Sequence, residues 1–193
     1  MNTIIVLTTV QLVAIALGAA SAFIIDIFFI TSLSHSKLRN HEVSMVRRLS
    51  LLSIVAACLA IFLQTLILFS IRETIPDSFL SFSFVTIIFT IAALICSITL
   101  RKVHLPSLLR HQNDHAHLSN HHLHHGEDIV LVSTISTVSW VSVLIIYAIA
   151  QDGHYSSPYP FIVGYIIFVV VMSGLTKMIK RHLLDSRKHK KSK

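Results

Sequence analysis

The chain has 193 residues, of which 53% are hydrophobic and only 13% are charged, and its mean hydropathy is +0.73. A soluble domain carries about 25% charged residues, so this composition excludes an ordinary soluble protein and predicts an integral membrane protein. A net charge of +7 would suggest nucleic-acid binding in a soluble protein. Here the basic residues cluster at the ends of apolar segments, which is typical of a membrane topology signal. We therefore expect a lipid bilayer, and no nucleic acid, as the partner.

Five apolar stretches follow one another along the chain, each near or above the ~20 residues that a helix needs to cross a bilayer. They cover residues 4–33, 49–71, 79–100, 129–150 and 159–176. Strict alternation is absent and the stretches are about twice as long as a barrel strand, so only helices are expected to span. The sequence predicts an all-α, polytopic transmembrane bundle in residues 1–176, with successive helices as antiparallel neighbours. The first stretch is too long for a signal peptide and is expected to stay in the mature chain.

The distribution of basic residues predicts the orientation of this bundle. The segments that connect successive spans lie alternately on the two sides of the membrane. Of the sixteen Lys and Arg residues, only Arg72 lies on one side, and all others lie on the opposite side. The positive-inside rule then places the N-terminus outside and the C-terminus in the cytoplasm, with the bacterial inner (plasma) membrane as the expected location. The cytoplasmic parts include a His-rich loop, residues 101–128, and a basic tail, residues 177–193. We expect the tail to anchor the topology and to contact anionic lipid.

The first apolar stretch carries a carboxylate on a face of small residues. Ala14, Gly18, Ala22 and Asp26 follow at intervals of four, so they share one face of a helix. Asp26 lies about 12 Å from the helix end near Ser34, at a rise of 1.5 Å per residue. A carboxylate at that depth costs several kcal/mol unless it is paired, hydrated or protonated. Asp26 is the only ionisable residue well inside a span, so intramembrane chemistry is expected to involve it.

The second stretch offers a partner for this carboxylate. One helical stripe of that stretch contains Arg47, Ser50, Ala57, Ala60 and Gln64. Because Arg47 sits at a matching depth, we predict a contact between Asp26 and Arg47. Two interpretations remain open: a proton or cation site, or a structural ion pair that locks two helices together. Under the second, loss of either residue mainly destabilises the protein.

The fourth stretch is rich in hydroxyl groups at its cytoplasmic half, where Ser133, Ser136, Thr137, Trp140 and Ser142 occur. These hydroxyls either line a polar path or bond to their own i−4 carbonyls and to neighbouring helices. Trp140 lies in mid-span, away from the usual interfacial belt, so we expect it to pack against another helix or to line a cavity. The predicted intramembrane polar site comprises Asp26, Arg47, Gln64, Ser136 and Trp140.

The His-rich loop holds eight of the thirteen histidines of the chain. If residues 111–125 are helical, several imidazoles project from one side, and Gly126 is available to end that helix. The predicted metal ligands are His115, His117, His121, His124 and His125, with zinc, nickel or copper as the candidate metals. The alternative is a solvated low-complexity loop.

Other chemistries receive less support from the sequence. Haem at the cytoplasmic edge is a less favoured cofactor than zinc, nickel or copper. Its candidate ligands are the histidines placed where helices end, namely His35, His41, His104 and His182. Cys58 and Cys96 fall inside apolar stretches and are expected to be small core residues rather than a disulfide. Phosphate-loop, nucleophile-elbow, zinc-protease and dinucleotide-binding motifs are missing from the sequence, so an enzyme is the least favoured class.

The order of these segments resembles a family of small, uncharacterised five-span bacterial membrane proteins. The resemblance covers nearly the whole chain, and the matching residues are Asp26, Phe28, Phe29, Glu42, Leu49, Ser50, Ser139 and Trp140. Some members of that family look as if they are joined to a cytochrome-b5-like haem domain, to which nothing in this chain corresponds. The resemblance implies the five-span fold and no activity.

Three functions therefore remain open. The first is cation or metal handling or transport at a polar site near Asp26, with the His-rich loop sensing or delivering the metal. The second is a membrane redox component that binds or docks haem, and the third is a structural or assembly protein without a ligand. For a transporter, the sequence is compatible with a homo-oligomer, because a second copy would supply the missing half of a repeat-type architecture.

Overall fold

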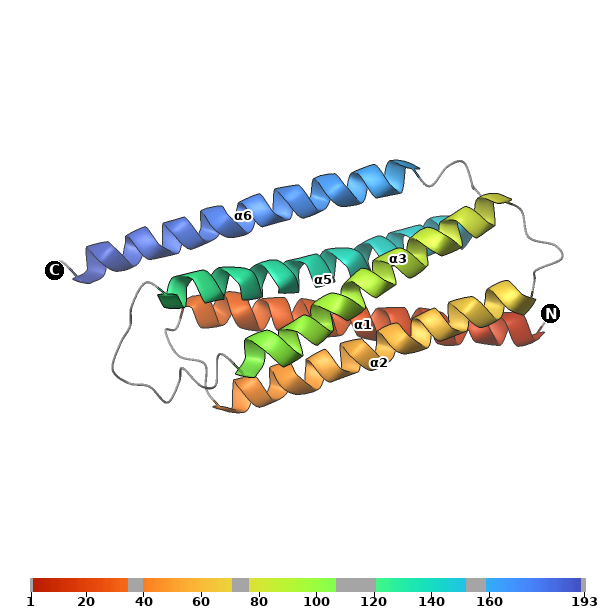
Figure 1. The fold of residues 1–193 in the computed structure, drawn as a ribbon, viewed down its shortest axis with the longest axis horizontal. Helices are drawn as coiled ribbons and strands as arrows, with labels where there is room; N and C mark the ends of the chain where they lie inside the picture. Colours follow the sequence, from red (N-terminus) through yellow and green to blue (C-terminus); the bar gives the residue numbers. More distant parts are fainter. Residues whose placement is uncertain (1, 35–39, 71–76, 107–120, 152–158, 192–193) are drawn as a thin grey trace.

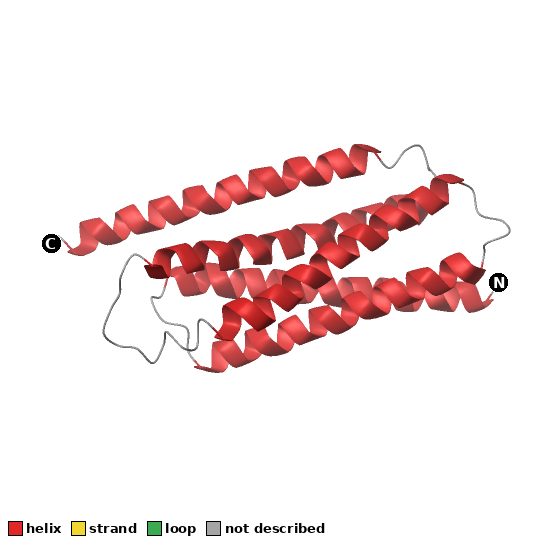
Figure 2. Cartoon of the chain, viewed as in Figure 1, coloured by secondary structure: helices red, strands yellow, loops and turns green. Residues whose placement is uncertain are grey.

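The computed structural model describes residues 2–34, 40–70, 77–106, 121–151 and 159–191, and every described residue is helical (Figure 2). The elements are α1 (Asn2–Ser34), α2 (Asn40–Ser70), α3 (Asp77–Thr99), α5 (His121–Gln151) and α6 (Tyr159–Lys191). A π-helix, η1 (Leu100–His104), continues α3 without a break. The predicted all-α class is confirmed for the described part of the chain.

Four helices have stretches long and apolar enough to cross a membrane. These stretches are Thr3–Phe29, Glu42–Ser70, Phe79–His104 and Ile129–Ile149. The fifth predicted span is also helical, but its apolar part in α6, Tyr159–Leu175, is shorter than the other four. The helices are thus those of an integral membrane protein, with four spans supported by length and composition.

The helices extend beyond the apolar stretches into the segment that the sequence analysis named the His-rich loop. Residues 101–104 belong to η1, and α5 already begins at His121, eight residues before the apolar stretch. Gly126 does not end a helix, because α5 passes through this residue. Hydropathy marks only the part of a helix that matches the hydrocarbon, whereas backbone hydrogen bonding continues into the polar region.

Helices α1, α2, α3 and α5 form a closed four-helix bundle. Each helix contacts the next, and α5 returns to contact α1. Helix α6 contacts α5 from outside this ring and is seen above the bundle in Figure 1. Successive helices run in opposite directions (Figure 1), as predicted. The N-terminal end of α1 and the C-terminal end of α6 therefore lie at opposite ends of the molecule.

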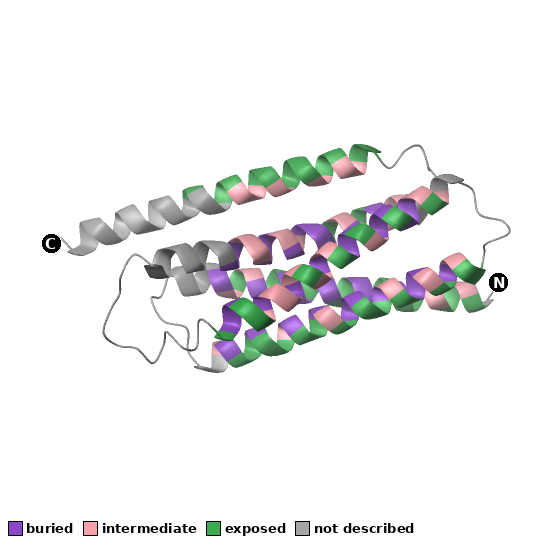
Figure 3. Ribbon diagram, in the orientation of Figure 1, coloured by how far each residue is buried: buried purple, intermediate pink, exposed green. Residues whose placement is uncertain are grey.

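The inner faces of the helices repeat with a spacing of three and four residues. The buried positions of α2 include a regular series, which comprises Val43, Val46, Ser50, Ser53, Ala57, Ala60, Gln64 and Ile67. This spacing averages 3.5 residues, which is the pattern of helices that cross at about 20° with interlocking side chains. The small residues among these positions allow close approach of the backbones, and Figure 3 shows buried residues along all four helices of the bundle.

Helix α6 is attached to the bundle by a few aromatic contacts. Between Tyr159 and Leu175, no side chain that the structure describes is buried (Figure 3). The ring of Tyr165 stacks on Phe89 of α3 at 4.2 Å between centroids, and Phe161 meets Phe82 edge-on at 5.5 Å. The core of the molecule is therefore the four-helix bundle, and α6 is a peripheral helix.

Candidate functional site

Polar side chains inside the bundle gather at three successive levels. We call them the amide layer (Gln11, Gln64 and Ser83), the indole layer (Trp140, Ser53 and Ser97) and the carboxyl layer (Asp26, Ser133 and Thr137). Asp26 lies 15 residues after Gln11 on α1, so the amide layer and the carboxyl layer are about 22 Å apart along that helix. Each layer joins different helices.

The amide layer connects α1, α2 and α3. The Gln11 Nε2 donates a hydrogen bond to the Gln64 Oε1, and the Gln64 Nε2 donates to the Ser83 hydroxyl at 2.9 Å. All three side chains are buried. In a bilayer the core offers no water to such groups, so their mutual bonds hold the three helices in one axial register.

The indole layer is a chain of hydrogen bonds whose direction follows from the number of protons. Ser97 donates its single hydroxyl proton to the Ala93 carbonyl at 2.9 Å. The Ser53 hydroxyl, 3.0 Å from that of Ser97, must then be the donor between the two serines. Its oxygen accepts the indole N–H of Trp140 at 3.2 Å. The chain ends on a backbone carbonyl, so it fixes the indole in place.

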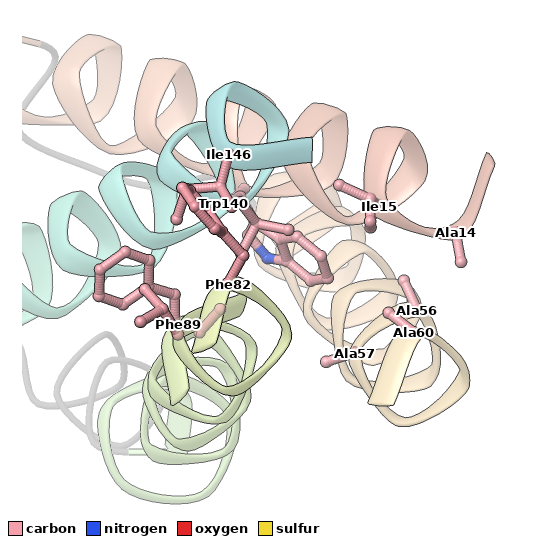
Figure 4. Packing of buried hydrophobic residues seen from close by; sticks show 13 residues of the cluster. Ala14, Ile15, Ala56, Ala57, Ala60, Phe82, Phe89, Trp140 and Ile146 are labelled. Carbon is pink, nitrogen blue, oxygen red and sulfur yellow. The ribbon is translucent and has the colours of Figure 1, made fainter. Parts of the chain in front are cut away.

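Trp140 fits between the helices because residue 18 is glycine. A Cβ on Gly18 would lie 2.6 Å from the indole Cε2 and even closer to Cζ2 and Cη2. Figure 4 shows the indole directed from α5 toward α2, between α1 and α3. The expectation that Trp140 packs against another helix is confirmed, since this side chain is fully buried. The small face of Ala14, Gly18 and Ala22 is also buried, as its spacing indicated.

The carboxyl layer joins α1 to α5. The Ser133 hydroxyl donates to the Asp26 Oδ1, and Asp26 itself is half-buried. The Thr137 side chain lies beside the same carboxyl. Its hydroxyl oxygen is buried. A carboxyl and two hydroxyls therefore converge at this layer.

The structure does not bring Asp26 and Arg47 into the predicted ion pair. The Arg47 side chain is exposed, and the hydrogen-bond donor to Asp26 is Ser133. Gln64 belongs to the amide layer and Trp140 to the indole layer, while Ser136 is buried on α5. Of the five residues predicted as one polar site, Asp26, Gln64 and Trp140 thus belong to three different layers.

Two hydroxyls of α5, those of Ser133 and Ser139, are used for packing. Ser133 bonds Asp26 on α1, and Ser139 donates to the carbonyl of Ile135 at 2.8 Å. Because the proton of Ser139 is committed there, the Tyr165 hydroxyl of α6 is the donor in the 2.9 Å bond between these two groups. Both packing modes expected from the sequence are present.

The two cysteines do not share the environment that the sequence suggested. Cys58 is exposed on the outer face of α2, and Cys96 is half-buried. The prediction that both are core residues is wrong for Cys58. Its position falls outside the 3.5-residue spacing of the buried face of α2.

The predicted metal ligands cannot be placed as a site. His115 and His117 lie outside the described residues, and of His121, His124 and His125 the structure describes only the helical backbone. Within the described side chains, no group of three or more His, Cys, Asp or Glu residues is arranged to hold a metal ion. Of the four histidines considered for haem, His104 is buried in η1. The side chains of His35, His41 and His182 lie outside the described part.

Several polar residues of the core were not anticipated from the sequence. Gln11, Ser53, Ser83 and Ser97 each make a buried bond between helices. A signal was present for Gln11, because an amide inside an apolar span has to find a partner. For the three serines the sequence carries little signal, since a serine satisfies itself by bonding to its own helix.

Comparisons of the chain with known protein families, with curated proteins and with solved structures found no match.

Proposed function

We propose that the protein is a five-span inner-membrane cation transporter in which Asp26 binds a proton or an alkali cation. One observation carries this proposal. A half-buried carboxyl is held by Ser133 and lies beside the hydroxyl of Thr137, without an ion-pair partner among the described residues. The cost of a carboxylate in apolar surroundings falls when a proton or a cation neutralises it.

The donor atoms of the carboxyl layer favour a hard cation. Asp26, Ser133 and Thr137 offer only carboxylate and hydroxyl oxygens. Zinc, nickel and copper prefer nitrogen and sulfur ligands, whereas protons and alkali cations are satisfied by oxygen. The candidate transition-metal ligands belong to the His-rich loop, so metal binding there stays a separate prediction.

The register of the helices places Asp26 near the end of the bundle that carries the basic residues. The bond between Gln11 and Gln64 aligns α1 with α2. Counted from this pair, Asp26 is 15 residues away and Arg47 is 17, so Asp26 is only about 3 Å deeper in the bundle than Arg47. In the opposite direction, the buried indole of Trp140 separates the carboxyl from the amide layer. Asp26 therefore lies closer to the basic end of the bundle than the amide and indole layers do.

The common end of the basic segments supports the proposed topology. Arg47 and Arg48 near the start of α2, Arg101 and Lys102 in η1, and the C-terminal part of α6 all belong to the same end of the bundle (Figure 1). A cytoplasmic location of this end satisfies the positive-inside rule and leaves the N-terminus outside. The apolar part of α6 is near the lower limit of length for a span.

The proposal is tested with purified protein in liposomes under an imposed gradient of H⁺ or of Na⁺, with the membrane potential clamped. We expect ion flux above that of empty liposomes, and a loss of at least about tenfold in Asp26→Asn. Asparagine keeps an acceptor oxygen for the Ser133 hydroxyl, so this variant should fold, but it carries no exchangeable charge. Ser133→Ala should reduce the flux by a smaller factor.

Ser21→Ala is the matched control, because this buried hydroxyl on α1 bonds only to the Leu17 carbonyl of its own helix. Its flux should equal that of the unchanged protein. Equal flux in Asp26→Asn would contradict the proposal. Failure of Asp26→Asn to fold, with Ser21→Ala intact, would support the structural role instead.

A further inference from the structure

Four cationic side chains lie on two neighbouring helical segments, apart from Asp26. Arg47 and Arg48 are on α2, and Arg101 and Lys102 are on η1. The two segments contact each other, and the buried residues beside these cations, among them Val46 and Leu100, belong to one apolar cluster. The packing of this cluster holds the two pairs of cations at the same end of the bundle.

These cations have no anionic partner in the described structure. Arg47, Arg48 and Lys102 are exposed and Arg101 is half-buried, and none of the four forms an ion pair with a described residue. On the elements packed around them the described acidic side chains are Asp26, which is bonded to Ser133, and Glu42, which has contacts of its own. Four like charges on adjacent segments repel one another unless an anion lies between or over them.

The two pairs lie at the same depth in the bundle. Arg47 is 23 residues from Ser70, where the apolar part of α2 ends, and Lys102 is 23 residues from Phe79, where that of α3 begins. At 1.5 Å per residue both distances are about 35 Å. The hydrocarbon core is ~30 Å thick and the bilayer with headgroups ~40–45 Å, so both pairs reach the phosphates of one leaflet.

We propose that Arg47, Arg48, Arg101 and Lys102 form a binding site for the headgroup phosphate of an anionic phospholipid. Arginine forks bond phosphate oxygens in pairs, and basic groups between membrane helices at the cytoplasmic side are typical sites for such headgroups. The site is distinct from Asp26, and it uses none of the basic residues of the tail. It recruits lipid to the seam between α2 and η1.

The test measures binding of phosphatidylglycerol to the full-length protein in zwitterionic detergent micelles, by native mass spectrometry and by titration, with phosphatidylcholine as the comparison lipid. We expect retention of phosphatidylglycerol by the unchanged protein. Replacing the four cations with Gln should weaken binding at least about tenfold, since each basic group near the surface contributes appreciably. A separate variant, in which both arginines of α2 are replaced with Lys so that the charge is kept, should retain most of the binding of the unchanged protein.

The control variant replaces Lys188, Lys190, Lys191 and Lys193 of the tail with Gln, which removes the same number of charges. It should bind phosphatidylglycerol with unchanged affinity. Equal losses in both variants would overturn the site in favour of a general surface potential, and full displacement by inorganic phosphate would overturn a lipid as the ligand. Circular dichroism and elution as a single species confirm the fold, and a loss in the folded Gln variant alone supports the site.

Discussion

The indole of Trp140 occupies the space next to α1 that a side chain at position 18 would need. The ring is fixed on its other side by the hydrogen bond to Ser53. It is fully buried, so it has no free direction in which to move. The close approach of α1 and α5 at this level therefore depends on the absence of a Cβ at Gly18.

Replacing Gly18 with Ala should destabilise the protein by about 1–3 kcal/mol, the usual cost of overpacking a core. The free energy of unfolding in a detergent or bicelle system measures this. Gly174→Ala on α6 is the control, because no atom lies within 4 Å of the Cβ it would add. That variant should be at least as stable as the parent, and equal stability of Gly18→Ala would show that the helices are not in close contact here.

Among the elements, α1, α2 and α3 are joined by the amide layer. Gln64 bonds both Gln11 and Ser83, so it is the shared member of the layer. Removing one amide leaves the other buried without its partner, which costs about 1–3 kcal/mol. Removing both leaves an apolar contact in place of the bond.

A double-mutant cycle tests this arrangement. Gln64→Leu and Gln11→Leu should each lower the free energy of unfolding, and the double variant should lose less than the two single losses combined. Gln64→Leu should cost more than Gln11→Leu, because it also releases Ser83. Strict additivity would mean that the two amides do not interact.

The sequence predicts which face of a helix is buried better than it predicts which residue of another helix that face contacts. The interval of four among Ala14, Gly18 and Ala22 identified a buried face, because helical periodicity determines which residues point the same way. It did not identify the partner of Asp26. Which residue of another helix reaches the same level depends on axial register, and this register is set by contacts such as Trp140 against Gly18.

At the scale of the whole molecule, the composition predicted the helical membrane class, and four apolar helices agree with it. The helix ends were less predictable, since α5 continues through Gly126 toward His121. Nothing in an apolar pattern marks where hydrogen bonding stops in the polar region. The peripheral place of α6 was also not predicted, because its apolar residues look like those of a core helix but are exposed.

The interior of the bundle is packed with two apolar clusters and three polar layers, and it holds a carboxyl near one end. The amide and indole layers close the interior beyond Asp26, and the hydroxyls of Ser133 and Thr137 face the carboxyl. We propose that the Asp26 carboxyl takes up and releases a proton or an alkali cation, and does not only join α1 to α5.

Infrared difference spectroscopy of the protein in a bilayer, recorded on steps of pH and of Na⁺ concentration, measures this most directly. We predict a change in a carboxyl band that is absent in Asp26→Asn, altered in Ser133→Ala and retained in Ser21→Ala. Identical difference spectra for the parent and Asp26→Asn would contradict the account, because the carboxyl would then exchange neither a proton nor a cation.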